Sequence, residues 1–142
     1  QNAGVTTIHL RAMRDDDDTA RTILATLQAA VDSRDLDRMT GLFTPDGVLV
    51  GTRRYNLGST AMRAYLQEEV VAREESLFWD LPELDVFLRS QEVIGFSGVG
   101  EIAVTSPAGG ERRFPFRLTI VASETADGWK IRHFHGSLPS AD

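Results

Sequence analysis

The spacing of apolar residues changes once along the chain, and this change limits the fold more than any other feature. From Thr19 to about Ser33, apolar residues recur at steps of three and four, which is the spacing of one face of an amphipathic helix. The pattern also predicts a short helix capped by Asp35 or Asp37 and a longer helix after Gly58. Beyond Phe78 the helical spacing disappears, and turn-rich segments separate four predicted strands, at about 83–90, 93–105, 111–123 and 129–138. Helices followed by a run of antiparallel strands predict one α+β domain, with the helices covering one face of the sheet.

Two polar segments are predicted to mark the boundaries of these elements. "DDDD" at Asp15–Asp18 is predicted to be a solvated N-terminal cap of the first helix, where carboxylates face the positive end of the helix dipole. "TPDG" at Thr44–Gly47 is predicted to be a turn before the short strand "VLVGT". We treat residues 1–14 as an N-terminal extension whose opening "QNA" is compatible with a cloning remnant, and 15–142 as a single domain.

Composition excludes several classes of protein. With a net charge of −6 and no run rich in Lys or Arg, the chain is not expected to bind nucleic acid. The absence of cysteine removes disulfides, thiolate nucleophiles and Cys-ligated metals, and is compatible with a reducing cytosol. No apolar run approaches the roughly 18–20 residues that span a bilayer. Because the N-terminus also lacks an apolar region typical of a signal peptide, we expect a cytoplasmic protein without a membrane partner.

The final hairpin places two histidines in one short segment, "WKIRHFHGSLPS". If Asp127 and Gly128 form a two-residue turn, cross-strand pairing sets His133 opposite Ala122 and His135 opposite Ile120. This register gives one uncharged face and one basic, mixed face, and the uncharged face is expected to lie against the helices because burial of charge is costly. Both imidazoles are therefore predicted to point inward. The alternative for each is an ordinary core imidazole that is hydrogen-bonded to a backbone carbonyl or a hydroxyl.

Several segments together resemble a known family. They are "RDLDRMTGLFTPDGVLVGT", a helix opened by "GSTAMRAYL", the strand "PFRLTIV" and the closing "GWKIRHFHGSLP". They resemble the SnoaL-like domains of the nuclear transport factor 2-like (NTF2-like) superfamily, also called the cystatin-like α+β cone. The resemblance covers roughly residues 19–139. It implies a strongly curved, mainly antiparallel sheet wrapped around the N-terminal helices, with an internal pocket that opens at one end.

The resemblance also implies a homodimer that forms through the outer face of the sheet. In the predicted register this face carries Phe134, Leu138 and Val121, an apolar group that suits such an interface. The alternative is that these are scattered surface residues.

The candidate site residues follow from this arrangement. His135 and His133, aided by Asp80, are the candidate catalytic residues, because imidazole serves as acid, base or hydrogen-bond donor near neutral pH. The alternative for Asp80 is a solvated loop acid. Glu69 lies on the inner face of the third helix and could reach the cavity rim. The predicted pocket wall comprises Tyr65, Trp79, Phe116, Leu118, Ile120 and Ser137.

No metal or cofactor is predicted, because His9 is the only other histidine and no acid lies at a predictable distance from the His-x-His pair. Two functions remain open. The first is a homodimeric pocket protein for a mostly apolar, carbonyl-bearing molecule, with cofactor-free isomerase, cyclase or dehydratase chemistry. The second is a non-catalytic association or ligand-sensing domain that works through the outer sheet face, since no acid matches the superfamily's catalytic aspartates and one fold hosts many functions.

Overall fold

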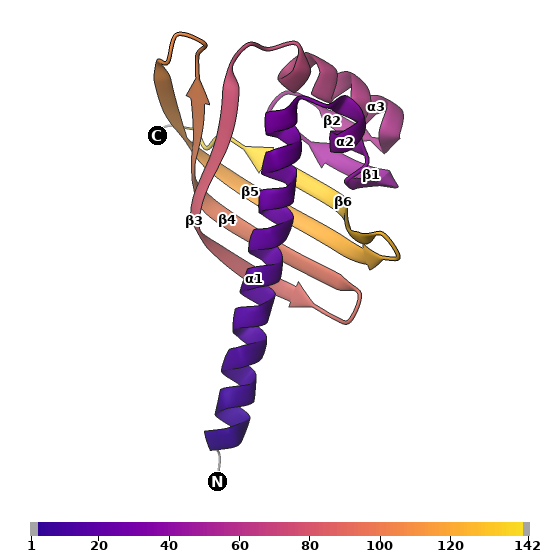
Figure 1. Cartoon of the computed structure of the whole chain (residues 1–142), viewed down its shortest axis with the longest axis vertical. Helices are drawn as coiled ribbons and strands as arrows, with labels where there is room; N and C mark the ends of the chain where they lie inside the picture. The colour runs from indigo at the N-terminus through magenta and orange to yellow at the C-terminus, as the bar shows by residue number, and fades with distance from the viewer. Residues whose placement is uncertain (1–2, 141–142) are drawn as a thin grey trace.

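The computed structural model describes residues 3–140, with side chains from residue 10 onward. Helices come first and are followed by a sheet of six strands (Figure 1). The helical elements are α1 (Ala3–Ser33), α2 (Leu36–Thr40), α3 (Gly58–Leu66) and the π-helical turn η1 (Gln67–Val71). The strands are β1 (Phe43–Val50), β2 (Tyr55–Leu57), β3 (Ser76–Arg89), β4 (Val93–Thr105), β5 (Glu111–Thr125) and β6 (Gly128–Ser137).

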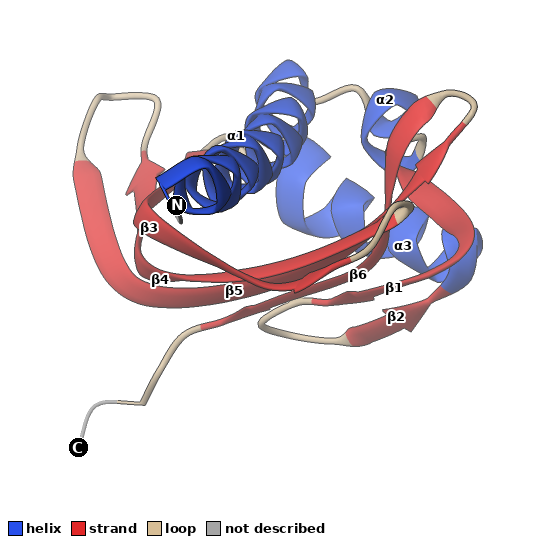
Figure 2. Cartoon of the chain, turned by 90° about the horizontal axis from the view of Figure 1, so that it is seen from below, coloured by secondary structure: helices blue, strands red, loops and turns tan. Residues whose placement is uncertain are grey.

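The sheet is open, mixed and curved, with strand order β2-β1-β6-β5-β4-β3. Only the β1–β6 pair is parallel, and the other neighbouring strands in this order are antiparallel. Figure 2 shows the helices together on one side of the curved sheet. The predicted α+β class, with helices on one face of a mainly antiparallel sheet, is therefore confirmed.

The core forms where the apolar stripe of α1 meets the inner face of the sheet. Strands β4 and β5 contribute alternate side chains to it, as expected for a sheet with one buried face. The helix residues in this core are Ala20, Ile23, Leu24, Leu27, Ala30 and Val31. Those of β4 and β5 are Ile94, Phe96, Phe116, Leu118, Ile120 and Ala122. This face of β5 agrees with the prediction.

Polar side chains of α1 bind the backbone of β3, which is an edge strand. Arg21 Nη1 donates to the carbonyl oxygen of Leu81 at 2.6 Å. Gln28 donates to the carbonyl of Leu77 at 2.8 Å and accepts from the backbone N–H of Trp79 at 3.0 Å. An edge strand exposes unpaired backbone groups, and this helix satisfies some of them. The helix thereby holds the part of β3 that carries Trp79.

The N-terminal part of the chain departs from the prediction. Helix α1 begins at Ala3, so Asp15–Asp18 lie inside the helix and are not its cap. Figure 1 shows this half of the helix projecting beyond the sheet. Asp16 pairs there with Arg89 of β3 at 3.0 Å, which gives one of these acids a partner inside the fold. By contrast, the predicted cap of α2 is confirmed, because Asp35 accepts from the backbone N–H of Arg38 at 3.1 Å.

Two strand boundaries also differ from the prediction. "TPDG" lies within β1, and its pairing with β6 is interrupted between Phe43 and Val48. Strand β3 begins at Ser76 and not near residue 83. Its apolar side chains do not alternate cleanly, because its pairing with β4 is irregular between Asp80 and Glu83. An irregular strand loses the period-two signal on which sequence interpretation depends.

The decisive difference is a β-bulge at Arg132. Near the turn, Ala122 pairs with Ile131, but Val121 pairs with His133, so one residue of β6 is extra. The bulge reverses the faces of the strand beyond it. As a result Ile131 and Phe134, three residues apart, both face the interior. The backbone N–H of Ile131 also donates to the carbonyl of Leu42 at 2.7 Å, which ties the strand to the segment before β1.

Candidate functional site

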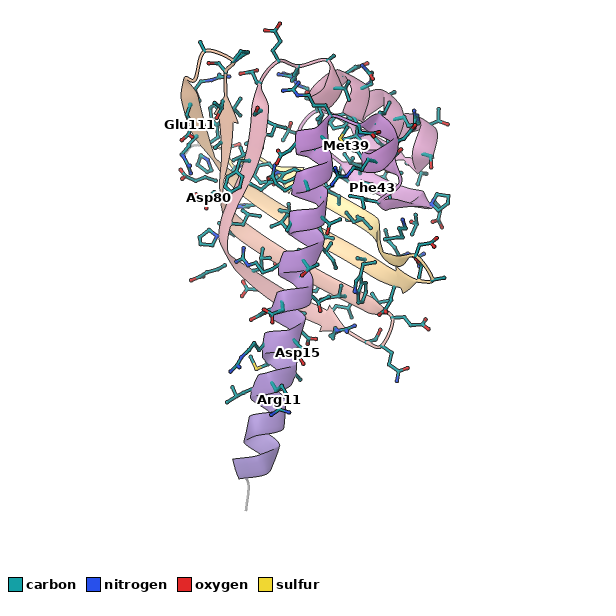
Figure 3. All side chains as sticks on the ribbon, in the orientation of Figure 1. Arg11, Asp15, Met39, Phe43, Asp80 and Glu111 are labelled. Carbon is teal, nitrogen blue, oxygen red and sulfur yellow. The ribbon has the colours of Figure 1, made fainter. Side chains whose placement is uncertain are left out.

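A cavity of about 320 Å³ lies between α1, α3 and the inner face of the sheet. Its volume is at the lower end of the range for small-molecule sites, roughly 300–1,000 Å³. The wall is mainly apolar and draws on both helices and most strands. Its apolar side chains are those of Leu27, Val31, Met39, Phe43, Leu49, Tyr65, Leu66, Val70, Leu77, Trp79, Ile102, Val104, Phe114, Phe116, Phe134 and Leu138. Figure 3 labels Met39 and Phe43 beside the upper part of α1.

The structure brings together only part of the predicted pocket wall. Tyr65, Trp79 and Phe116 do line the cavity. Leu118 and Ile120 face inward as predicted, but they are fully buried in the core and are not among the cavity-lining residues.

The predicted inward orientation of the two histidines is wrong. His135 is exposed and pairs with Thr119, while the half-buried His133 pairs with Val121. Both imidazoles lie on the outer face of the sheet, with ring centroids 6.4 Å apart. Near the turn, the observed pairing of β5 with β6 differs from the predicted pairing by two residues. A shift of two residues leaves each side chain on the same face of the strand. The bulge at Arg132 is therefore the feature that turns the rings outward. The apolar ring of Phe134 occupies the interior instead, which is favourable because an imidazole needs polar partners when it is buried.

Asp80 and Ser137 also lie outside the cavity. Asp80 forms an ion pair with Arg113 at 2.8 Å, and Glu101 and Glu111 bind the same guanidinium. Figure 3 labels Asp80 and Glu111 near each other on the left of the view. The hydrogen bond to Glu111, followed by that to Asp80, raises the pKa of Arg113 above its ordinary value. Ser137 pairs with Arg117 on the outer face.

Two of the three residues predicted for the dimer surface do not lie on the outer face of the sheet. Phe134 is only 7% exposed and lines the cavity, and Leu138 lines it as well, so neither belongs to the outer face. Val121 is on the outer face as predicted, beside His133.

Five charged residues line the cavity, and they form one chain of ion pairs that we call the rim network. Arg53 Nε lies 3.5 Å from Glu69, and Glu69 also pairs with Arg73 at 2.9 Å. Arg73 lies 3.8 Å from Glu75, which accepts from Arg112 at 2.6 Å. Glu69 is the most enclosed member, with its side chain 19% exposed, whereas Arg53 and Arg112 are 65% and 64% exposed. The carboxylates therefore lie deeper than the two terminal guanidinium groups.

The rim network depends on an unusual backbone segment. Helix α3 continues into η1, and π-helical turns are rare and often occur at functional sites. Arg34, which follows α1 with a φ of 56°, donates to the carbonyl of Arg73 and, at 2.9 Å, to that of Glu75. One guanidinium thus holds the backbone of two members of the rim network.

One polar group of the cavity wall lacks a partner. The indole Nε1 of Trp79 is buried and makes no hydrogen bond within the part of the chain that the structure describes. The indole ring packs against Phe134, with a centroid distance of 5.9 Å. A buried indole N–H usually has an acceptor, so this unpartnered group is an exception within the described residues.

The sequence pattern placed Glu69 at the rim, and its pairing with Arg73 follows from their i,i+4 spacing, but the pattern did not reveal Arg53 or Arg112. Arg112 alternates with Phe114 and Phe116 on β5, so extension of the inward face by two steps would have identified it. Arg53 follows β1 in a loop, and nothing in the local pattern indicates its contact with Glu69.

The described residues offer little for other kinds of site. Among the described side chains, those of residues 10–140, no group of three or more acidic or histidine residues is placed to hold a metal ion. Between residues 3 and 140 no helix combines the length and the apolar character needed to cross a membrane.

The family model of the SnoaL-like domain matches residues 20–141, which is most of the chain. The protein belongs to the SnoaL-like domain family. This SnoaL-like protein has no match among curated protein sequences.

Solved structures of the NTF2-like superfamily share its fold. A proposed calcium/calmodulin dependent protein kinase II association domain from Xanthomonas campestris has a TM-score of 0.75 at 19% identity, with 87% of each chain covered. A proposed dehydratase of the NTF2-like family from Streptomyces avermitilis has a TM-score of 0.75 at 18% identity, covering 90% of this chain and 99% of that one. An NTF2-like protein with a cystatin-like fold from Novosphingobium aromaticivorans has a TM-score of 0.71 at 16% identity, covering 100% and 93%. At these identities the likeness establishes the fold alone.

Proposed function

We propose that this SnoaL-like protein binds a small, mostly apolar molecule in the cavity beneath α1. The observation that carries the proposal is the cavity of about 320 Å³ with its mainly apolar, aromatic-rich wall. Burial of a ligand's apolar surface against such a wall supplies the main driving force for binding.

Any acid–base chemistry in this cavity would use groups other than those suggested by the sequence. His133, His135 and Asp80 lie on the other side of the sheet and cannot touch a ligand in the cavity. Of the cavity-lining residues, Glu69, Glu75 and Tyr65 carry side chains that can transfer a proton. Isomerase or dehydratase chemistry, to which the family is suited, would depend on these residues.

The test uses the neutral fluorophore N-phenyl-1-naphthylamine, which becomes fluorescent in apolar surroundings. Ile102 lines the cavity from β4, whereas Val99 lies on the outer face of the same strand and is exposed. Ile102→Trp fills the cavity and is expected to abolish binding of the fluorophore, and Val99→Trp is expected to retain it. Equal binding by both variants would show that the fluorophore does not occupy the cavity and would refute the proposal.

The outer face of the sheet supports a second role, which is self-association. Across the neighbouring strands β2, β1, β6 and β5, its side chains are mainly apolar or uncharged. They are Leu57, Val48, His133 and Val121 in one row, and Tyr55, Val50, His135 and Thr119 in the next. Tyr55 and Leu57 are 67% and 62% exposed, which is unusual for two large apolar side chains on one short strand. A second copy of the chain is the occupant that we propose, with a non-catalytic association domain as the alternative to the pocket function.

Self-association is tested by light scattering coupled to size-exclusion chromatography. Val121→Glu places a charge on this face, beside His133, and is expected to give a monomer, because an unpaired charge in an interface is costly. Thr22→Glu, on the exposed side of α1, is the matched control. A wild-type protein that is monomeric at micromolar concentration contradicts the proposed dimer.

A further inference from the structure

The charges at the cavity rim indicate the class of ligand, an inference that rests on the proposed binding function. The rim network alternates in sign along its length, with arginine at both ends. Three guanidinium groups face two carboxylates, so the residues that line the cavity carry one excess positive charge. This local excess contrasts with the net charge of −6 of the whole chain. A net positive rim in an acidic protein attracts an anion to this one place.

The position of the charges within the network supports the same conclusion. Glu69 is bound by two arginines, and Glu75 by Arg73 and Arg112, so neither carboxylate is free to bind a cation. Arg53 and Arg112 each have a single carboxylate partner in the described residues, and each is about two-thirds exposed. A guanidinium group has five N–H donors, so both retain donors for a further acceptor.

Neighbouring charges do not cancel this excess. Arg54 pairs with Glu68 at 2.5 Å, which is neutral as a unit, and its guanidinium lies over the Tyr65 ring at 5.5 Å. Glu74 adjoins the network in sequence but is not among the residues that line the cavity. The guanidinium of Arg112 lies 5.7 Å from the ring centroid of Phe114, so a cation and an apolar surface adjoin at the same point of the wall.

We infer that the ligand is an amphipathic organic anion, with an apolar ring system in the cavity and a carboxylate or similar anionic group at Arg53 and Arg112. The apolar wall takes the body of the molecule, and the arginine ends of the rim network take its charge. An anion displaces no carboxylate from the network, because unused guanidinium donors are already present. A cation would be repelled by these guanidinium groups, and a neutral acceptor would form weaker hydrogen bonds with them than an anion does.

Two fluorophores that differ by one charged group test this inference. N-phenyl-1-naphthylamine is neutral, and 1-anilinonaphthalene-8-sulfonate carries the same ring system with a sulfonate. The measured quantity is the ratio of their dissociation constants, neutral over anionic, for each variant. We expect Arg112→Gln and Arg53→Gln each to lower this ratio by about 2- to 5-fold, as for the loss of one exposed ion pair. Arg38→Gln, on the exposed surface of α2, is the control and should leave the ratio unchanged.

Salt provides an independent measurement. Raising the ionic strength from 0.05 to 0.5 M should weaken binding of the sulfonate and not of the neutral fluorophore, because exposed charges are screened over a shorter distance. A ratio that stays the same in both arginine variants overturns the inference, even if the neutral fluorophore binds in the cavity as proposed. Binding of neither fluorophore, or retention of both by Ile102→Trp, refutes the cavity function and this inference together.

Discussion

Phe134 and His135 are adjacent residues on opposite faces of β6, and their alanine variants measure which face is the interior. Phe134 is 7% exposed and packs on Trp79 at a centroid distance of 5.9 Å, whereas His135 is exposed. Truncation of a buried Phe to Ala typically costs about 3–5 kcal/mol. Because the Phe134 ring already borders a cavity, it has fewer packing partners than a ring in a filled core. We therefore expect the lower end, about 3 kcal/mol.

His135→Ala should change the free energy of unfolding by no more than about 0.5 kcal/mol, as is usual for an exposed position. For a domain of this size, about 3 kcal/mol corresponds to a decrease in Tm of roughly 10 °C. The assay is equilibrium unfolding in urea, followed by tryptophan fluorescence at two protein concentrations tenfold apart. The two concentrations separate any contribution from dimerisation, which depends on concentration.

If His135→Ala is as destabilising as Phe134→Ala at the lower concentration, the outward orientation of the His135 side chain is contradicted. That result would place the imidazoles inside and would restore the register without a bulge. A difference of about 2–3 kcal/mol in the expected direction supports the bulge at Arg132 as the feature that decides the faces of β6.

Two further substitutions test how the cavity wall is built. A Cβ atom at Gly51 would overlap the ring of Tyr65. Gly51→Ala should therefore lower the free energy of unfolding by about 1–3 kcal/mol, measured by equilibrium unfolding, and displace this ring from the cavity wall. An unchanged free energy of unfolding would contradict the close approach of Gly51 to Tyr65. Arg34→Lys should lower both the free energy of unfolding and the affinity for 1-anilinonaphthalene-8-sulfonate. The reason is that an ammonium group cannot bind several carbonyls in the planar geometry of a guanidinium. Unchanged affinity in a folded variant would show that Arg34 does not position the rim network.

Much of the fold could be predicted because it depends on local spacing. The stripe of α1 and the alternation of β5 both follow from how often an apolar residue recurs, and the structure confirms both. The same alternation would have reached Arg112. The helical propensity of residues 3–18 was underestimated, because four consecutive aspartates are more typical of a cap than of a helix interior.

The candidate site was harder to predict, because its polar members meet only after folding. Glu69 and Arg73 are four residues apart on one helical segment, so their pairing was visible in the sequence. Arg53, Glu75 and Arg112 come from separate segments, and their contacts depend on how η1 meets the sheet. No local pattern carries that information.

The sequence by itself determined the class of the fold, the face of β5 that is buried and the family to which the chain belongs. These follow from residue spacing and short motifs, which are local properties of the chain. The tertiary structure alone decided which side of β6 is the interior, because the pairing of β6 with β1 on one side and β5 on the other includes a single extra residue at Arg132. That choice favours burial of Phe134 over two imidazoles, and it moves the candidate site from the histidines to the cavity wall and its arginine rim.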